Sequence, residues 1–205
     1  MTIAIIKYGM GNVASVQKAL HKLGYSSIIT NDPDEIRKSA YILLPGVGSF
    51  EAGMINLHRL GLVDLLTDEV CIKKKPFFGI CLGMQLLATF GNEPHKVKGL
   101  GWIEGEVVKL HFSDDRRIPH IGWNNISLAN KTNVFLQEFS GLDYYFIHSY
   151  HFVPTTNSEI VFTVDYGIPI VAAIKKGNIF ATQFHPEKSQ EAGASLLKKV
   201  IGSHA

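Results

Sequence analysis

The first half of the chain alternates short apolar runs with segments in which apolar residues recur at helical spacing. The apolar runs have the length and β-branched content of strands: Thr2–Ile6, Ser26–Thr30, Tyr41–Leu44 and Phe77–Ile80. Apolar residues recur at helical spacing over about 13–23, where Gly24 marks the end of the helix, and again over roughly 50–71. A further helix is predicted to begin after Asp32, a typical N-cap residue that is followed by Pro33 and Glu35. Because these strands are apolar throughout, the pattern predicts a parallel sheet that helices bury on both faces.

From about Trp102 to Phe184 the pattern changes to short strands separated by turn residues. Four strand-like runs stand out: Tyr144–Ile147, Ile160–Val164, Ile170–Ile174 and Ile179–Phe184. Lys176-Gly177-Asn178 predicts a hairpin turn between the last two. One helix is predicted near Asn133–Phe139, and another closes the chain from about Gln190 to Ile201. We expect one α/β domain over residues 1–205: a mostly parallel central sheet flanked by helices, with an antiparallel β extension.

Composition narrows the class of protein. The chain has 205 residues, of which 46% are hydrophobic, enough for one large core. With Lys+Arg at 20 and Asp+Glu at 18, the net charge is +2, which argues against nucleic acid or an anionic membrane surface as the main partner. Its two cysteines, Cys71 and Cys81, make no disulfide framework, and no apolar run is long enough for a signal peptide or a membrane span. We expect a soluble protein of the cytoplasm.

The segment around Cys81 carries the strongest chemical signal. An apolar strand runs into Gly79-Ile80-Cys81-Leu82-Gly83 and then into a helical pattern, which is the nucleophile-elbow arrangement with cysteine in place of serine. A side chain at either glycine is expected to collide with adjacent backbone. The turn would place Cys81 at a helix N-terminus, which favours a thiolate, and would make the Leu82 amide an oxyanion donor. The alternative is that Cys81 is a small buried side chain without chemistry.

A thiolate nucleophile needs a base, and the base needs a group that orients it. Among nine histidines His185 is best placed, because it ends an apolar strand that Pro186 stops. Glu187 lies two residues on, close enough to accept a hydrogen bond from the imidazole. Taken alone, this segment is typical of a solvated surface turn. Together with the elbow around Cys81, it indicates a general base and the carboxylate that orients it. Cys71 has no such setting and is expected to be inert.

Three further signals are weaker. Tyr8-Gly9-Met10-Gly11-Asn12 is similar to a phosphate-binding loop, but it lacks the third glycine and no acidic residue ends the second strand. His148 and His151 have no Cys or carboxylate nearby at ligand spacing, which argues against a metal. Pro45-Gly46-Val47-Gly48 ends a strand, so it is either an ordinary turn or a loop that offers backbone amides to the site of Cys81.

Two of these motifs together resemble a known family. Gly79-Ile80-Cys81-Leu82-Gly83-Met84-Gln85, followed much later by His185-Pro186-Glu187, resembles the class I (triad) glutamine amidotransferases. Further segments are similar to the glutaminase subunits of imidazole glycerol phosphate synthase, an enzyme of histidine biosynthesis: Tyr8–Asn12, Leu44–Phe50, Gly99–Gly101, Pro119–Asn124 and His148–Tyr150. The resemblance extends from Ile5 to Ser189.

The resemblance implies a role for each matching position. Cys81, His185 and Glu187 would be the catalytic triad. The substrate L-glutamine and its oxyanion would be held by residues of four segments, namely Gly46, Val47, Gly48, Leu82, Gln85, Glu93, His148, Ser149 and Tyr150. No metal or organic cofactor is implied.

The resemblance also implies a partner. Asn12, Trp123 and Lys188 match positions that face a (β/α)8-barrel cyclase subunit, which receives the ammonia and makes imidazole glycerol phosphate and AICAR. The family usually has aspartate where this chain has Lys7, next to the loop that carries Asn12. Three alternatives stay open: a paralogous glutaminase supplying another acceptor such as a surface-polysaccharide sugar, a catalytically silent partner subunit, and a cysteine hydrolase or peptidase of similar topology.

Overall fold

The computed structural model describes residues 1–129 and 134–203, built around one nine-stranded sheet. Five parallel strands form one half, in the order β2 (Ser26–Thr30), β1 (Thr2–Ile6), β3 (Tyr41–Gly46), β4 (Phe77–Cys81) and β13 (Ile179–Thr182). Four antiparallel strands continue it, in the order β12 (Pro169–Lys176), β11 (Ile160–Asp165), β8 (His120–Leu128) and β9 (Asp143–His148). The parallel sheet, its antiparallel extension and the hairpin between β12 and β13 were all predicted from the sequence and are confirmed.

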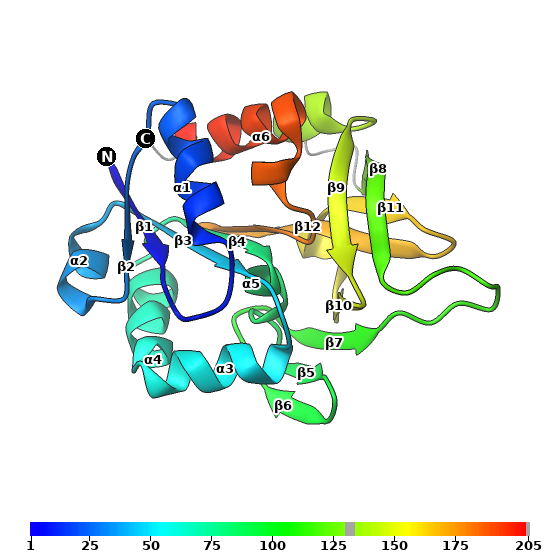
Figure 1. Ribbon diagram of the computed structural model, residues 1–205, viewed down its shortest axis with the longest axis horizontal. Helices are drawn as coiled ribbons and strands as arrows, with labels where there is room; N and C mark the ends of the chain where they lie inside the picture. Colours follow the sequence, from blue (N-terminus) through cyan, green and yellow to red (C-terminus); the bar gives the residue numbers. More distant parts are fainter. Residues whose placement is uncertain (130–133, 204–205) are drawn as a thin grey trace.

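Helices cover both faces of the parallel half. Figure 1 shows α1 (Val13–Lys22) and α6 (Gln190–Gly202) above the sheet, and α3 (Phe50–Arg59) and α4 (Leu62–Thr67) below it. The buried apolar residues accordingly form two clusters, one on each side of the strands. Both faces of β3 and β4 are therefore covered, which explains why the sequence of these strands is apolar throughout. None of the helices that the structure describes is long and apolar enough to cross a membrane.

Side-chain caps define where the helices begin. Asp32 accepts hydrogen bonds from the amides of Asp34 (2.8 Å) and Glu35 (3.1 Å), and Pro33 is the first residue of α2 (Pro33–Lys38), as the sequence predicted. Asn12 accepts from the Ser15 amide at the start of α1 in the same way (3.2 Å). These local signals fix the helix starts without help from the rest of the fold.

A second, four-stranded sheet was not predicted. Its strands run in the order β10 (Tyr150–Pro154), β7 (Gly105–Lys109), β5 (Phe90–Asn92) and β6 (Lys96–Lys98). Strands of three residues carry too little periodicity to be recognised in the sequence. This sheet matters for function because β10 brings Tyr150 against the short helix α5 (Leu82–Gln85) that follows Cys81.

Three predicted elements differ in the structure. The helical pattern over 50–71 is divided into α3 and α4 at Gly61, which has a φ of +65°, and ends in a π-helical turn over Asp68–Ile72. The helix predicted near Asn133–Phe139 is a 3₁₀ helix over Val134–Phe139, and Asn133 lies outside the described residues. β13 ends at Thr182 and not at Phe184, because the Thr182 hydroxyl donates to the Phe184 carbonyl and turns the chain.

Candidate active site

The carboxyl ends of three neighbouring parallel strands meet at one point of the sheet. Gly46 at the end of β3 pairs in register with Cys81 at the end of β4. On the other side of β4, Ile80 pairs with Thr182 at the end of β13, three residues before His185. Strand ends of this kind are where α/β folds place their ligand sites. The register thus brings together segments that are far apart in the sequence.

The turn at Cys81 is a strained elbow. Cys81 has a φ of +54°, a region that residues with a side chain rarely adopt. A Cβ on Gly79 would lie 2.8 Å from the Gly83 carbonyl oxygen, and one on Gly83 would lie 1.9 Å from that of Leu44. The predicted need for glycine at both positions is confirmed.

The helix after the elbow is shorter than the sequence indicated. α5 has four residues, because the carbonyls of Leu86, Leu87 and Ala88 accept hydrogen bonds from the returning segment 100–103 instead of continuing a helix. A single turn has a weaker dipole than a long helix. The stabilisation of a thiolate must therefore depend more on neighbouring side chains than the sequence suggested.

Gly83→Ala is expected to lower the free energy of unfolding by about 3 kcal/mol or more, since the new methyl group overlaps a backbone carbonyl that cannot move away. Urea denaturation followed by circular dichroism measures this. Gly202→Ala is the matched control, because its Cβ would meet only Tyr25 Oη at 3.5 Å, an ordinary contact. An equal, small effect for both variants would show that the elbow is not tightly packed.

His185 and Glu187 form a buried pair. Nδ1 of His185 lies 2.8 Å from Oε1 of Glu187, and both side chains are only 3% exposed. Burial alone would lower the pKa of His185, but the interactions of the ring with Cys81 and Glu187 outweigh burial and raise that pKa to about 10. Within the part of the chain that the structure describes, Nε2 of His185 has no hydrogen-bond partner. The ring is therefore oriented through Nδ1, and its other nitrogen is left for Cys81.

Strand β9 holds the loop that carries this pair. The His185 amide donates to the Tyr145 carbonyl (3.0 Å). The buried Ser189 hydroxyl donates to the His185 carbonyl (2.7 Å) and accepts from the Tyr145 amide (3.0 Å). Ser189 was not singled out from the sequence, since a single serine after a turn has no distinctive pattern.

A cavity of about 430 Å³ opens at Cys81. Most of the predicted substrate residues line it together with the thiol: Val47, Gly48, Leu82, Gln85, Glu93, His148, Ser149 and Tyr150. Gly46, the remaining predicted substrate residue, is not among the residues that line this cavity. A Cβ on Gly46 would lie 2.3 Å from Tyr8 Oη and 2.8 Å from the Leu82 Cβ, so this glycine lets β3 pack against the elbow.

Some of the lining side chains are already engaged by the protein. One carboxylate oxygen of Glu93 accepts from the Phe50 amide at the start of α3 (2.9 Å). His148 uses both ring nitrogens, Nδ1 with the Tyr150 carbonyl (2.9 Å) and Nε2 with His120 (3.0 Å). Glu93 and His148 therefore shape the cavity and hold its walls, and the His148 ring has no free nitrogen for a ligand.

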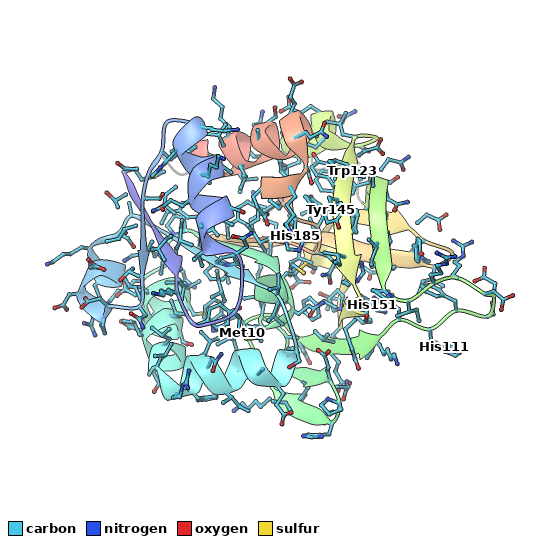
Figure 2. The ribbon with its side chains drawn as sticks, in the orientation of Figure 1. Met10, His111, Trp123, Tyr145, His151 and His185 are labelled. Atoms are coloured by element: carbon cyan, nitrogen blue, oxygen red, sulfur yellow. The ribbon has the colours of Figure 1, made fainter. Side chains whose placement is uncertain are left out.

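An exposed apolar face adjoins the mouth of the cavity. It consists of two cross-strand pairs, Ile121 with Ile147 and Trp123 with Tyr145, and we call it the β8–β9 face. Trp123 is 46% exposed, and its ring centroid lies 5.9 Å from that of Tyr145. Figure 2 shows these two rings on neighbouring strands beside His185.

Two of the three predicted interface residues belong to this region. Trp123 is part of the β8–β9 face, and the Lys188 ammonium lies 5.7 Å from the centroid of the Tyr145 ring and also lines the cavity. Asn12 is exposed at the start of α1, where its side chain serves as the helix cap.

The second cysteine lacks these features. Cys71 is half-buried on the π-helical turn after α4, and burial raises the pKa of its thiol. The charged groups that act on its thiol are Lys74 and Lys176, not a histidine paired with a carboxylate. Among the residues that the structure describes, no group of three or more His, Cys, Asp or Glu side chains is placed to hold a metal ion.

Comparison with known proteins agrees with this geometry. The family model described as glutamine amidotransferase class-I matches residues 4–201. The chain therefore belongs to the class-I glutamine amidotransferases. A solved structure of PurLQS from Thermotoga maritima has the same fold, with a TM-score of 0.75 at 16% sequence identity, over 100% of this chain and 99% of that one.

Within that family the chain belongs with the HisH subunits of imidazole glycerol phosphate synthase. It is 44% identical over 199 residues to imidazole glycerol phosphate synthase subunit HisH 2 of Methanococcus maripaludis, covering 97% of this chain and 98% of that one. It is also 44% identical over 196 residues to subunit HisH of Moorella thermoacetica, covering 96% and 92%.

Proposed function

We propose that this protein is the glutaminase subunit of an imidazole glycerol phosphate synthase. It hydrolyses L-glutamine to glutamate and ammonia through Cys81, His185 and Glu187, and passes the ammonia to a barrel-shaped cyclase subunit in histidine biosynthesis. The observation that supports the proposal most directly is the meeting of β3, β4 and β13. A strained cysteine and a glycine loop line one cavity there, and the segment after β13 carries a histidine that is oriented by a carboxylate.

The first chemical step uses the Cys81–His185 pair. The raised pKa of His185, to about 10, favours the imidazolium near neutral pH, so His185 can hold the proton that leaves Cys81 when the sulfur attacks. The thiolate attacks the side-chain amide carbon of glutamine. Glu187 keeps the imidazolium ring oriented through Nδ1, with Nε2 toward the sulfur and the departing nitrogen.

The tetrahedral intermediate carries a negative oxygen that needs donors. Leu82 is the first residue of α5, so its amide has no intrahelical partner, and Val47 stands in the glycine loop across the cavity. We assign the amides of Val47 and Leu82 to the oxyanion. His185 then protonates the departing ammonia, and water hydrolyses the glutamyl thioester. These steps require no metal or organic cofactor.

The partner completes the proposal. We place the cyclase subunit of the heterodimer on the β8–β9 face, which includes Trp123 and lies beside Lys188. The exposed apolar side chains of this face adjoin the mouth of the cavity. Ammonia released into water becomes unreactive ammonium at neutral pH, so a closed path to the partner has a chemical purpose. We assign the reaction to the cytoplasm, where the free thiols of Cys71 and Cys81 stay reduced.

The isolated chain is expected to hydrolyse glutamine about 10²–10³-fold more slowly than the complex with a cyclase subunit and its nucleotide ligand. Glycines on both sides of Val47 let its peptide turn, so that either its N–H or a carbonyl faces the oxyanion. A partner that selects the N–H orientation restores one donor. The measurement is steady-state glutamate release by the chain alone and in the complex.

Two variants make this experiment specific. Trp123→Ala should weaken the activation, because it removes the central side chain of the β8–β9 face. Ile72→Ala removes an apolar side chain that is even more exposed (71%), on the π-helical turn, and should leave the activation unchanged. Full activity without any partner would refute the gating, and glutamine hydrolysis that no cyclase subunit stimulates would favour another acceptor.

A further inference from the structure

Gln183 is a fully buried polar residue next to the nucleophile that the proposed mechanism does not use. Its side chain is 0% exposed, two residues before His185. Its amide nitrogen Nε2 lies 3.6 Å from Sγ of Cys81, within the range of a hydrogen bond to sulfur. Its backbone amide donates to the Ala172 carbonyl on β12 (2.8 Å), which fixes the position of the residue beside the elbow.

The orientation of the Gln183 side chain follows from its neighbours. Nε2 of Gln85 donates both to the Tyr150 carbonyl (2.8 Å) and to Oε1 of Gln183 (3.0 Å). A backbone carbonyl can only accept, so Gln85 must turn its nitrogen toward Tyr150. The second hydrogen on that nitrogen then requires an oxygen from Gln183. The Gln183 nitrogen is consequently directed to Cys81, where it can only donate.

The Tyr150 carbonyl, on which this orientation depends, is itself held in place. It also accepts from Nδ1 of His148 (2.9 Å), whose Nε2 is 3.0 Å from Nδ1 of His120. The His120 ring is stacked against Phe146 (centroids 4.8 Å apart) and Tyr166 (4.0 Å). Burial lowers the pKa of His148 to about 3, so this ring is neutral. Its hydrogen is on Nδ1, which donates to the Tyr150 carbonyl, and its Nε2 therefore accepts from His120.

We propose that Gln183 is a further catalytic residue, whose side-chain N–H donates to the Cys81 thiolate, and that Gln85 and the Tyr150 carbonyl impose this orientation. The inference deepens the proposed glutaminase function and rests on it for its role in the reaction. The donor stabilises the sulfur anion before it attacks glutamine. It does so again when water attacks the thioester carbon, the C–S bond breaks and the electron pair returns to sulfur. The one-turn length of α5 makes such a donor more important.

The test measures the thiolate directly and needs no glutamine. In a Cys71→Ala background, the alkylation rate of Cys81 by iodoacetamide is recorded as a function of pH. Gln183→Met keeps the length of the side chain and removes the donor. It is expected to move the midpoint of the pH–rate profile upward by about one pH unit. Gln137→Leu, at an exposed glutamine on the 3₁₀ helix Val134–Phe139, is the matched control and should leave the midpoint in place.

A second variant keeps the test decisive if Gln183→Met does not fold. Gln183→Glu retains an oxygen for Gln85 but brings a carboxylate toward the sulfur, so an upward shift of at least one pH unit is expected. An unchanged or lowered midpoint in whichever variant folds, checked by circular dichroism, would overturn the proposal and leave Gln183 as a packing residue. Because alkylation is independent of glutamine, failure of the glutaminase assay would count against the proposed function and not against this donor.

Discussion

Cys81→Ala is expected to reduce the rate of glutamine hydrolysis by about 10⁴–10⁶-fold. Removing the nucleophile of a catalytic triad has effects of this order, because the remaining groups can only orient water and stabilise the oxyanion. The measurement is steady-state release of glutamate with the cyclase subunit present. A low rate then cannot be caused by the Val47 loop turning a carbonyl toward the oxyanion. Cys81→Ser is expected to be nearly as inactive, since a hydroxyl is far less acidic than a thiol.

Cys71→Ala is the control for this prediction and should retain nearly full activity. Cys71 lies on the π-helical turn after α4, where burial raises the pKa of its thiol and so disfavours the thiolate. A glutamine-like alkylating reagent should accordingly modify Cys81 alone. Labelling of Cys71 with Cys81 left intact would contradict the assignment of the nucleophile, and an active Cys81→Ala variant would favour a catalytically silent subunit.

His185→Ala is expected to be about as damaging as loss of the thiol, again about 10⁴-fold or more in kcat. In the proposed mechanism the imidazole both takes the proton of Cys81 and gives it to ammonia, so the acyl-enzyme would not form without it. Its raised pKa, about 10, depends on Cys81 and Glu187 together. Activity equal to wild type at saturating glutamine would remove His185 from the mechanism.

Glu187→Gln should be less damaging than His185→Ala. Its kcat is expected to be about 10–100-fold higher than that of the His185→Ala variant. The proposed role of Glu187 is to orient the imidazole through the 2.8 Å contact with Nδ1, and a glutamine side chain at this position still offers an oxygen for that contact. With the carboxylate charge gone, the pKa of His185 falls, and the imidazolium form is lost at a lower pH than in the wild type. The upper limb of the pH–kcat profile should move to lower pH. An unchanged profile would show that Glu187 only fills space.

Local signals in the sequence were enough for most of the parallel sheet and for naming the candidate catalytic groups. Local patterns of a few residues define the apolar strands, the caps of α1 and α2 and the glycines of the elbow. Such patterns can be recognised directly in the sequence. Cys81, His185 and Glu187 could be named for the same reason, since each lies in a short motif at the end of a strand. The second sheet was missed, because β5 and β6 are too short to show a period.

What the sequence by itself determined is therefore which side chains are the candidates for chemistry and where most of the first strands and helices begin. The tertiary structure decided which of them meet. Register across β3, β4 and β13 places Cys81 opposite Gly46 and close to the His185 loop, although more than 100 residues of chain separate the two ends of the site. It also shows that Gly46 packs against the elbow, that α5 has only one turn, and that the Gln183 amide points at the thiol. The physical reason is that a hydrogen bond depends on where two groups lie in space and which one can donate, and neither is encoded in the order of residues along the chain.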